Sequence, residues 1–126
     1  MKIRHSRRAA QIGALLLCLT GLLGAGAGQE LTGTASYYGA GEPLNDNTSM
    51  NIPFDARLME CASWEFPLGS VLEVTSLRTG KRVIVRCTDR GPARRLNRLI
   101  DLTREAFAEI DRLDLGLITV RVRRLK

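Results

Sequence analysis

The 126-residue sequence has very little histidine, and this scarcity limits the chemistry that it can support. Its one histidine, His5, stands in a basic segment at the N-terminus, so the rest of the chain has no Ser-His or Cys-His pair for nucleophilic catalysis. Of the three cysteines, only Cys61 and Cys87 lie outside residues 1–27, and without histidine they are too few for a structural zinc site. We therefore predict no metal and no cofactor, which leaves carboxylates as the groups for acid-base chemistry.

Long hydrophobic runs are also absent, except for one between Ala9 and Leu23. Four basic residues precede this run and four small residues follow it, in the order of a secretory signal peptide and its cleavage site. The run is short for a membrane span, which needs about 20 apolar residues. We therefore predict a signal peptide at residues 1–27 and an exported domain at residues 28–126, periplasmic or extracellular, with no stable membrane span after cleavage.

Two other fates of the N-terminal segment stay open. The segment is a retained anchor if it is not cleaved, or a lipid-attachment site if Cys18 is modified. A small residue normally precedes a lipid-attachment cysteine, whereas Leu17 precedes Cys18. We therefore interpret Cys18 as part of the segment that is removed.

Excess positive charge is largely a property of the signal peptide. The chain has 19 Lys and Arg against 13 Asp and Glu, and four of the basic residues but none of the acidic ones lie in residues 1–27, so the net charge falls from +6 to +2 on cleavage. We therefore expect no nucleic-acid partner. The remaining charge is asymmetric, −6 over residues 28–77 and +8 over residues 78–126. We interpret this asymmetry as mutual attraction within one domain, with a basic rim for an anionic polymer as the alternative.

The pattern of the exported domain is typical of a small, mainly β barrel. Alternating apolar residues and turn signals predict about five or six short strands, and helical spacing predicts one helix, from its N-cap Thr103 to Gly116. A loop without apolar periodicity, rich in Gly, Pro, Asn and Asp, covers residues 40–55. The clearest strands cover residues 33–38, 71–75, 82–86, 99–102 and 118–122. A domain of about 99 residues has one core, small enough to need further stabilisation.

Cys61 and Cys87 are candidates for that stabilisation. In an exported protein an even pair of cysteines predicts a disulfide, here between positions about 26 residues apart. On a loop-entropy estimate, such a bridge adds about 3 kcal/mol to the free energy of unfolding.

Asp89 is the strongest candidate for a catalytic group. The strand predicted over residues 82–86 leads towards it, and Gly91-Pro92 then forces a turn, so the carboxylate stands at the exit of a strand beside Arg90. A carboxylate in this setting is a candidate general acid/base. The alternative is structural, because an aspartate at the start of a turn often accepts hydrogen bonds from backbone N–H groups.

Several short motifs of the exported domain resemble those of one known family. They are Gly33-x-Ala35-Ser36-x-Tyr38-Gly39, Phe66-Pro67-Leu68-Gly69, Thr79-Gly80-Lys81, Asp89-Arg90-Gly91-Pro92 and Ile100-Asp101-Leu102-Thr103. In this order they resemble the rare lipoprotein A (RlpA) family of double-psi β-barrels, which are similar to expansins, barwin and some endoglucanases. The resemblance covers residues from about Thr32 to Leu125. It implies a small six-stranded double-psi β-barrel with one short helix, in an envelope protein that acts on peptidoglycan glycan strands.

The resemblance also indicates where the site lies. Some family members are lytic transglycosylases, which implies that Asp89 is the acid/base that cleaves a glycosidic bond without water and leaves a 1,6-anhydromuramyl end. Around it we predict substrate contacts from Tyr38, Trp64, Arg90 and Asp101, since aromatic rings pack on sugars. For Asp101 the alternative is structural, as a cap of the following helix or a partner of an arginine. We expect the domain to be a monomer.

A cluster of arginines at positions 94, 95 and 98 follows the Gly91-Pro92 turn. Such a cluster is usually a solvated loop. The alternative is a clamp for muramyl or peptide carboxylates, which arginine binds through two parallel hydrogen bonds.

The chain departs from the family pattern at two of three polar site positions. Ile52 stands where active members carry Glu, and Ser63 stands where they carry His. Glu60 and Glu65 are alternative acids in the same region. Whether the domain is an enzyme is therefore open at this point. A non-catalytic, expansin- or barwin-like module that binds glycan or supports the envelope is the alternative function, and a secreted inhibitor-type interaction protein is a third.

Overall fold

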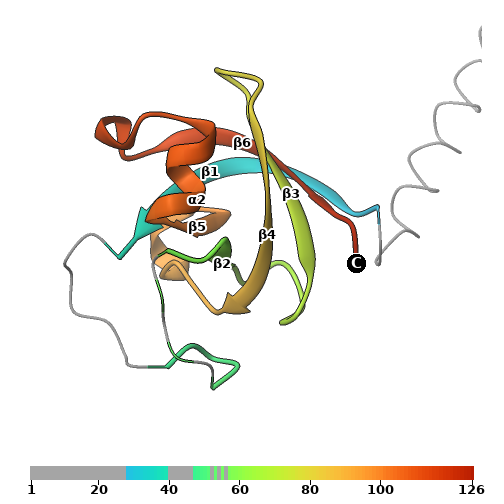
Figure 1. The fold of residues 1–126 in the computed structure, drawn as a ribbon. Helices are drawn as coiled ribbons and strands as arrows, with labels where there is room; N and C mark the ends of the chain where they lie inside the picture. The colour runs from blue at the N-terminus through green and yellow to red at the C-terminus, as the bar shows by residue number, and fades with distance from the viewer. Residues whose placement is uncertain (1–27, 40–46, 52, 54, 56) are drawn as a thin grey trace, which may run out of the picture.

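Six strands of the computed structural model close into a barrel, and one short helix packs against it (Figure 1). The structure describes residues 28–39, 47–51, 53, 55 and 57–126, so Ile52 lies outside the described residues. The elements in chain order are β1 (Glu30–Tyr38), β2 (Glu60–Ala62), β3 (Val71–Ser76), β4 (Arg82–Asp89), the 3-10 turn η1 (Arg94–Leu96), β5 (Ile100–Thr103), α2 (Arg104–Ile110), the 3-10 turn η2 (Leu113–Leu115) and β6 (Ile118–Arg124). The expected class, mainly β with six strands and one short helix, is confirmed.

The order of strands around the barrel is β1-β5-β2-β4-β3-β6, which places distant parts of the sequence side by side. β1 pairs with β5 and β2 pairs with β4 in parallel, whereas the other neighbouring pairs are antiparallel. Each parallel pair requires a crossover, because a tight hairpin joins only antiparallel strands. The crossovers place β2 between β4 and β5, so Ala62, Asp89 and Asp101 become neighbours.

The interior of the barrel is filled by every second residue of the strands, as the alternation of side chains in a strand requires. In β6, Ile118, Val120 and Val122 are buried and alternate with exposed polar residues. Phe66 and Phe107 are the largest of the fully buried side chains. Burying an apolar side chain of this size contributes roughly 1.5–3 kcal/mol, so this core supplies most of the favourable free energy of folding.

The helix α2 is shorter than the sequence pattern indicated. Thr103 is its N-cap as predicted, because the Thr103 hydroxyl accepts a hydrogen bond from the Ala106 N–H. The helix ends at Ile110, however, and the prediction that it continues to Gly116 is wrong. The backbone becomes extended at Asp111, and the separate turn η2 follows. No helix within the described residues is long and apolar enough to cross a membrane.

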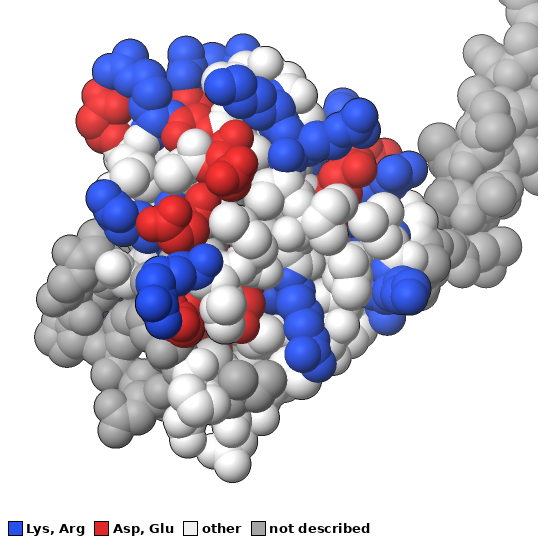
Figure 2. Space-filling view, in the orientation of Figure 1, with Lys and Arg blue, Asp and Glu red and all other residues white. Residues whose placement is uncertain are grey.

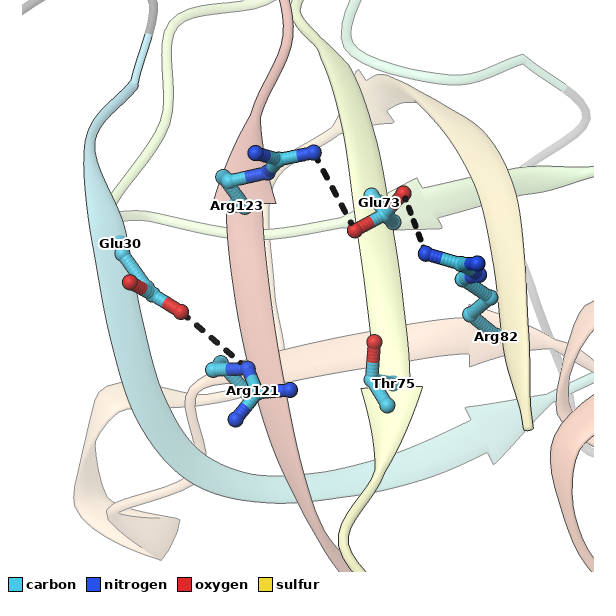
Figure 3. A pocket seen from close by; sticks show the side chains of 6 residues that line it. All are labelled: Glu30, Glu73, Thr75, Arg82, Arg121 and Arg123. Carbon is cyan, nitrogen blue, oxygen red and sulfur yellow. Dashed lines mark ion pairs between the residues drawn. The ribbon is translucent and has the colours of Figure 1, made fainter. Parts of the chain in front are cut away.

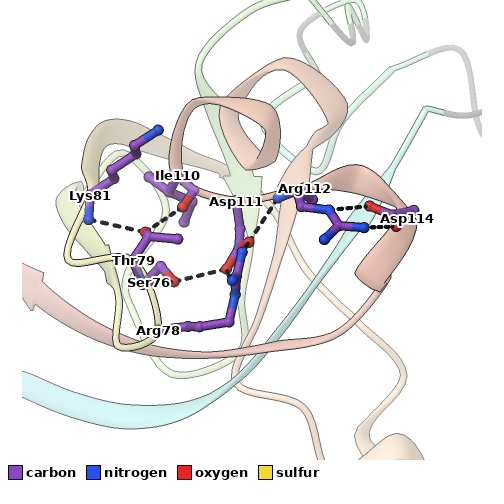
Figure 4. Close-up of polar contacts among 8 residues, drawn as sticks. All are labelled: Ser76, Arg78, Thr79, Lys81, Ile110, Asp111, Arg112 and Asp114. Atoms are coloured by element: carbon purple, nitrogen blue, oxygen red, sulfur yellow. Dashed lines mark hydrogen bonds and ion pairs between the residues drawn. The ribbon is translucent and has the colours of Figure 1, made fainter.

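Asp111 explains this early end, because it joins α2 to the β3–β4 hairpin (Figure 4). Its carboxylate accepts hydrogen bonds from the Ser76 hydroxyl at 3.0 Å, from the Arg112 N–H at 2.8 Å and from the Arg78 guanidinium, with which it forms an ion pair. The carboxylate is fully buried, and hydrogen bonding to Arg78 lowers its pKa to about 2. Thr79 adds a 2.7 Å hydrogen bond from its hydroxyl to the last carbonyl of α2.

Charged residues on the outer face of β1, β6, β3 and β4 form ion pairs across strands (Figure 3). Glu73 lies 3.7 Å from Arg82 and 3.5 Å from Arg123, and Glu30 lies 3.1 Å from Arg121. The glutamates come from the acidic half of the sequence and the arginines from the basic half. Figure 2 likewise shows basic and acidic side chains interspersed. On this face, the charges of the acidic and basic halves of the sequence therefore attract each other.

Candidate functional site

A row of paired residues crosses four neighbouring strands and brings two candidate carboxylates together. Ser36 on β1 pairs with Asp101 on β5, Asp101 pairs with Ala62 on β2, and Ala62 pairs with Asp89 on β4, next to a register shift in β2. Asp89 and Asp101 both contribute to raising the pKa of the Tyr38 phenol, so the two carboxylates lie near one side chain. Ala62 stands between them in the sheet, so Asp89 and Asp101 are separated by two strand spacings, roughly 10 Å between backbones.

Asp89 is held by hydrogen bonds to only one of its carboxylate oxygens. Its Oδ1 accepts from the Ser49 N–H at 3.0 Å, from the Ser49 hydroxyl at 2.5 Å and from the Arg90 N–H at 2.8 Å. The hydrogen bond from the Arg90 N–H is of the kind that an aspartate accepts at the start of a turn, which is the structural alternative for Asp89. Within the described part of the chain no donor reaches Oδ2. The half-buried carboxylate is therefore fixed in orientation, with one oxygen left to contact a ligand.

Ser49 is a site residue that the sequence did not reveal. It stands 40 positions before Asp89, in a segment described above only as a loop. No spacing rule links two residues so far apart, so only the folded chain identifies this contact.

Tyr38 and Asp101 lie on the same side of the barrel wall as Asp89. The Ser36 hydroxyl donates to Asp101 Oδ1 at 3.0 Å, which fixes that carboxylate. Tyr38 is buried, and burial, with smaller contributions from Cys61, Asp101 and Asp89, raises the pKa of its phenol far above the usual value. The phenol therefore stays protonated at physiological pH and keeps its capacity to donate a hydrogen bond.

Arg90 binds protein carbonyls. One of its terminal nitrogens donates to the Ser63 carbonyl at 3.0 Å and to the Phe66 carbonyl at 2.7 Å. This nitrogen holds the segment between Ser63 and Phe66 against the end of β4. The predicted contact of Arg90 with substrate stays a prediction.

Ser63, for which the resemblance predicts the position of a histidine, is fully buried and binds the backbone. Its hydroxyl donates to the Leu99 carbonyl at 2.9 Å, and its N–H donates to the Asp89 carbonyl at 3.1 Å. Glu60, an alternative acid, is also buried and accepts a 2.9 Å hydrogen bond from the Thr88 hydroxyl. Neither side chain faces open solvent beside Asp89.

Trp64 is the exposed aromatic side chain of the site. The residue is 40% exposed, and its Nε1–H donates to the Pro92 carbonyl at 2.8 Å. The guanidinium of Arg94 lies over the ring, 4.5 Å from its centroid. The structure thus couples Trp64 to the arginine cluster, a contact across 30 residues that the sequence pattern did not indicate.

Cys61 and Cys87 are neighbours, but the predicted disulfide is absent from the structure, which contains two buried free thiols. The residues are directly paired on the parallel strands β2 and β4. Burial is the largest cause that raises the pKa of the Cys61 thiol. In this state the two thiols pack as small apolar groups in the core.

Comparison with known proteins identifies relatives of this barrel. The sequence model of a family described as "Lytic transglycolase" matches residues 30–122. The probable endolytic peptidoglycan transglycosylase RlpA of Treponema pallidum is 36% identical over 117 residues, covering 92% of this chain and 36% of the relative. The endolytic peptidoglycan transglycosylase RlpA of Campylobacter jejuni is 35% identical over 95 residues, covering 75% of this chain and 34% of the relative. The chain thus spans about a third of the length of these relatives.

Solved structures share the fold. A Streptomyces papain inhibitor superimposes with a TM-score of 0.62 and 25% identity, covering 79% of this chain and 97% of the inhibitor. An expansin from Clavibacter michiganensis superimposes with a TM-score of 0.59 and 22% identity, covering 77% of this chain and 50% of the expansin. The expected double-psi β-barrel is thereby confirmed.

Proposed function

As the chain belongs to the lytic transglycolase family of double-psi β-barrels, we propose that it cleaves the glycan strands of peptidoglycan in the cell envelope. The observation that carries this proposal is Asp89, which stands at the exit of β4 with Oδ1 anchored by Ser49 and Arg90. Oδ2, for which the described residues provide no donor, is oriented for contact with the substrate. The relatives named for this activity match the chain across the barrel.

One carboxyl group suffices for the reaction. Protonated Asp89 donates its proton to the glycosidic oxygen as the bond from C1 of the muramyl sugar to that oxygen breaks. The C6 hydroxyl of the same sugar then attacks C1, and the Asp89 carboxylate accepts the hydroxyl proton. The products are a free hydroxyl end and a 1,6-anhydro end, and the acid is regenerated. Ordinary glycoside hydrolysis differs, because a second carboxylate must activate water or form a covalent intermediate.

Other residues of the site have supporting roles in this proposal. Asp101, fixed by Ser36, accepts hydrogen bonds from sugar hydroxyls, and the protonated Tyr38 phenol is a donor on the same face. Trp64 offers its exposed ring for packing on a sugar. Arg90 orders the loop beside the acid and has a remaining guanidinium edge for the substrate.

Export and oxidation belong to the same proposal. A signal peptide at residues 1–27 would deliver the domain to the periplasm or the cell exterior, where disulfides persist. Cys61 and Cys87 are directly opposed on adjacent strands, so a disulfide can form between them without a change of strand pairing, by exchange with an external protein disulfide that is reduced to a dithiol. The disulfide would tie β2 to the strand that ends at Asp89.

A glycan-binding module without catalysis is the second candidate function. It is favoured by Ser63, whose buried hydroxyl is bound to the Leu99 carbonyl and cannot replace an exposed histidine beside Asp89. In that case the face around Asp89 and Asp101 binds glycan and does not cleave it.

The experiment that separates the two functions incubates the exported protein with purified peptidoglycan glycan strands and detects 1,6-anhydro ends by mass spectrometry. We expect Asp89→Asn to lower cleavage by at least about 10²-fold, since the amide keeps hydrogen-bonding capacity but cannot transfer the proton. Asp114→Asn is the matched control, because this exposed acid lies in η2 and pairs with Arg112. Binding without cleavage by the natural protein supports the module. Undiminished cleavage by the Asp89→Asn protein refutes the mechanism.

A further inference from the structure

The first half of β1 has a neighbouring strand on one side only among the described residues. β6 pairs with β1 over Glu30–Ala35, whereas β5 pairs with the opposite side of β1 only over Ala35–Tyr38 (Figure 1). Before β5 begins, the Leu99 N–H donates to the Thr34 carbonyl at 2.9 Å on that opposite side. Within the part of the chain that the structure describes, a short strand edge over residues 30–33 thus stays open.

Thr32 directs its backbone groups to this open edge. Backbone groups of alternate residues in a strand point to the same edge, and the Thr34 carbonyl faces Leu99 on this edge. The N–H and the carbonyl of Thr32 therefore point the same way, away from β6. No strand of the described residues pairs with them there. Backbone groups are strong donors and acceptors, so this edge can bind the backbone of an extended peptide.

A groove of about 420 Å³ borders the open edge. Residues 31–34 of β1 and loop residues 97–99 line it, together with Glu65. Gly33 allows the loop to lie close to β1, because a Cβ at this position would be 2.8 Å from the Leu99 Cβ. Pockets for small ligands measure about 300–1,000 Å³, and four residues of a strand span roughly 13 Å. The groove therefore suits a short peptide.

Two charges of opposite sign line the groove, from Arg98 and Glu65. Arg98 is half-buried and Glu65 is exposed. Neither side chain forms an ion pair with a described residue, in contrast to Arg78, which is paired with Asp111. Arginine binds a carboxylate through two parallel hydrogen bonds, and a carboxylate accepts strong hydrogen bonds from an ammonium group. The groove is thus complementary to the two charged ends of a short peptide.

From the open edge, the groove and its two charges, we infer that this part of the barrel binds a short peptide with a free ammonium group and a free carboxylate. The peptide adds an extended strand to β1 through hydrogen bonds with the backbone of Thr32. Arg98 binds the carboxylate of the peptide, and Glu65 binds its ammonium group. None of these residues belongs to the row that holds Asp89, so this binding goes beyond the proposed cleavage of glycan and does not depend on it.

The test is isothermal titration calorimetry of the exported protein with three synthetic tetrapeptides of the sequence Thr-Val-Thr-Val, whose residues favour an extended backbone. One has free termini, the second is amidated at its C-terminus, and the third is acetylated at its N-terminus. We expect the free peptide to bind about tenfold more tightly than either blocked one, since each block removes one charge-assisted contact. No binding of the free peptide, or equal binding of all three, overturns the inference.

Two variants assign the charged contacts. Arg98→Gln should bind the free peptide as weakly as the natural protein binds the amidated one. Glu65→Gln should likewise bind it as weakly as the natural protein binds the acetylated one. Arg104→Gln is the matched control, because this half-exposed arginine on α2 lies outside the groove and should keep the natural affinity. Unchanged affinity in Arg98→Gln overturns the assigned site.

A third variant tests the addition of a strand. Thr32→Pro removes the N–H that faces the open edge, and proline is tolerated in an edge strand where its nitrogen faces outward. This variant should bind the free peptide at least about tenfold more weakly, whereas Thr32→Val, which keeps the N–H, should bind it normally. Normal binding by a folded Thr32→Pro protein refutes strand addition. If that variant does not fold, Arg98→Gln and the amidated peptide decide. These titrations contain no glycan, so their failure is distinct from a failure to cleave glycan strands.

Discussion

Replacing Asp111 with alanine should destabilise the barrel, because one buried carboxylate joins α2 to the β3–β4 hairpin. The substitution removes the acceptor for the Ser76 hydroxyl, the Arg112 N–H and the Arg78 guanidinium. Hydrogen bonds to a charged group contribute roughly 1.5–3 kcal/mol, but the side chain of Arg78 is 55% exposed, so solvent screens its share. We therefore expect a loss of about 2 kcal/mol in the free energy of unfolding.

For a domain of this size, a loss of about 2 kcal/mol lowers the melting temperature by roughly 8–16 °C. Thermal unfolding at pH 7, followed by circular dichroism, measures this shift. Asp114→Ala is the matched control, since its side chain is 64% exposed and should leave the melting temperature nearly unchanged. Asp111→Asn, which keeps the shape of the side chain, provides a folded comparison if the alanine variant does not fold.

The pH dependence tests the same reasoning. The pKa of Asp111 is lowered to about 2 in the folded state, from an ordinary value of 3.8, so the carboxylate stabilises the fold fully at a pH above about 4. This contribution is lost as the pH falls from about 4 to about 2, because over that range the unfolded state takes up a proton and the folded state does not. The difference between the natural protein and Asp111→Ala should therefore shrink over that range. An equal difference at pH 7 and pH 2, or an equal effect of Asp114→Ala, would refute the role of the buried carboxylate.

Three further predictions concern export, oxidation and packing. N-terminal sequencing of the exported form should begin near Gly28, and an intact residue 2 would contradict cleavage of the signal peptide. Thiol titration of the unreduced, denatured protein should find no free thiol, and Cys87→Ser should lower the melting temperature; two reactive thiols would contradict the disulfide. Gly33→Ala should cost roughly 1–3 kcal/mol by chemical denaturation, because the added Cβ would lie 2.8 Å from the Leu99 Cβ. An unchanged denaturation midpoint would mean that the Leu99 side chain moves aside without cost.

Much of the barrel could be predicted from the sequence, because strand alternation and caps depend on near neighbours. Ile118, Val120 and Val122 alternate with polar residues, and this pattern alone indicated β6 and its buried face. Thr103 indicated the start of α2 in the same way, since an N-cap binds a backbone group within three residues. The motif around Asp89 placed that carboxylate at the exit of a strand, where β4 ends.

The tertiary structure decided what depends on partners far apart in the chain. α2 ends at Ile110 because Asp111 binds Arg78, a residue 33 positions away that no helical pattern includes. Asp89 and Asp101 lie near each other because the crossovers place β2 between their strands, and this pairing is a property of the closed barrel. The contact of Arg94 with Trp64 likewise exists only after the loops meet in space. Local sequence determines which face each side chain takes, whereas long-range strand pairing determines which faces meet.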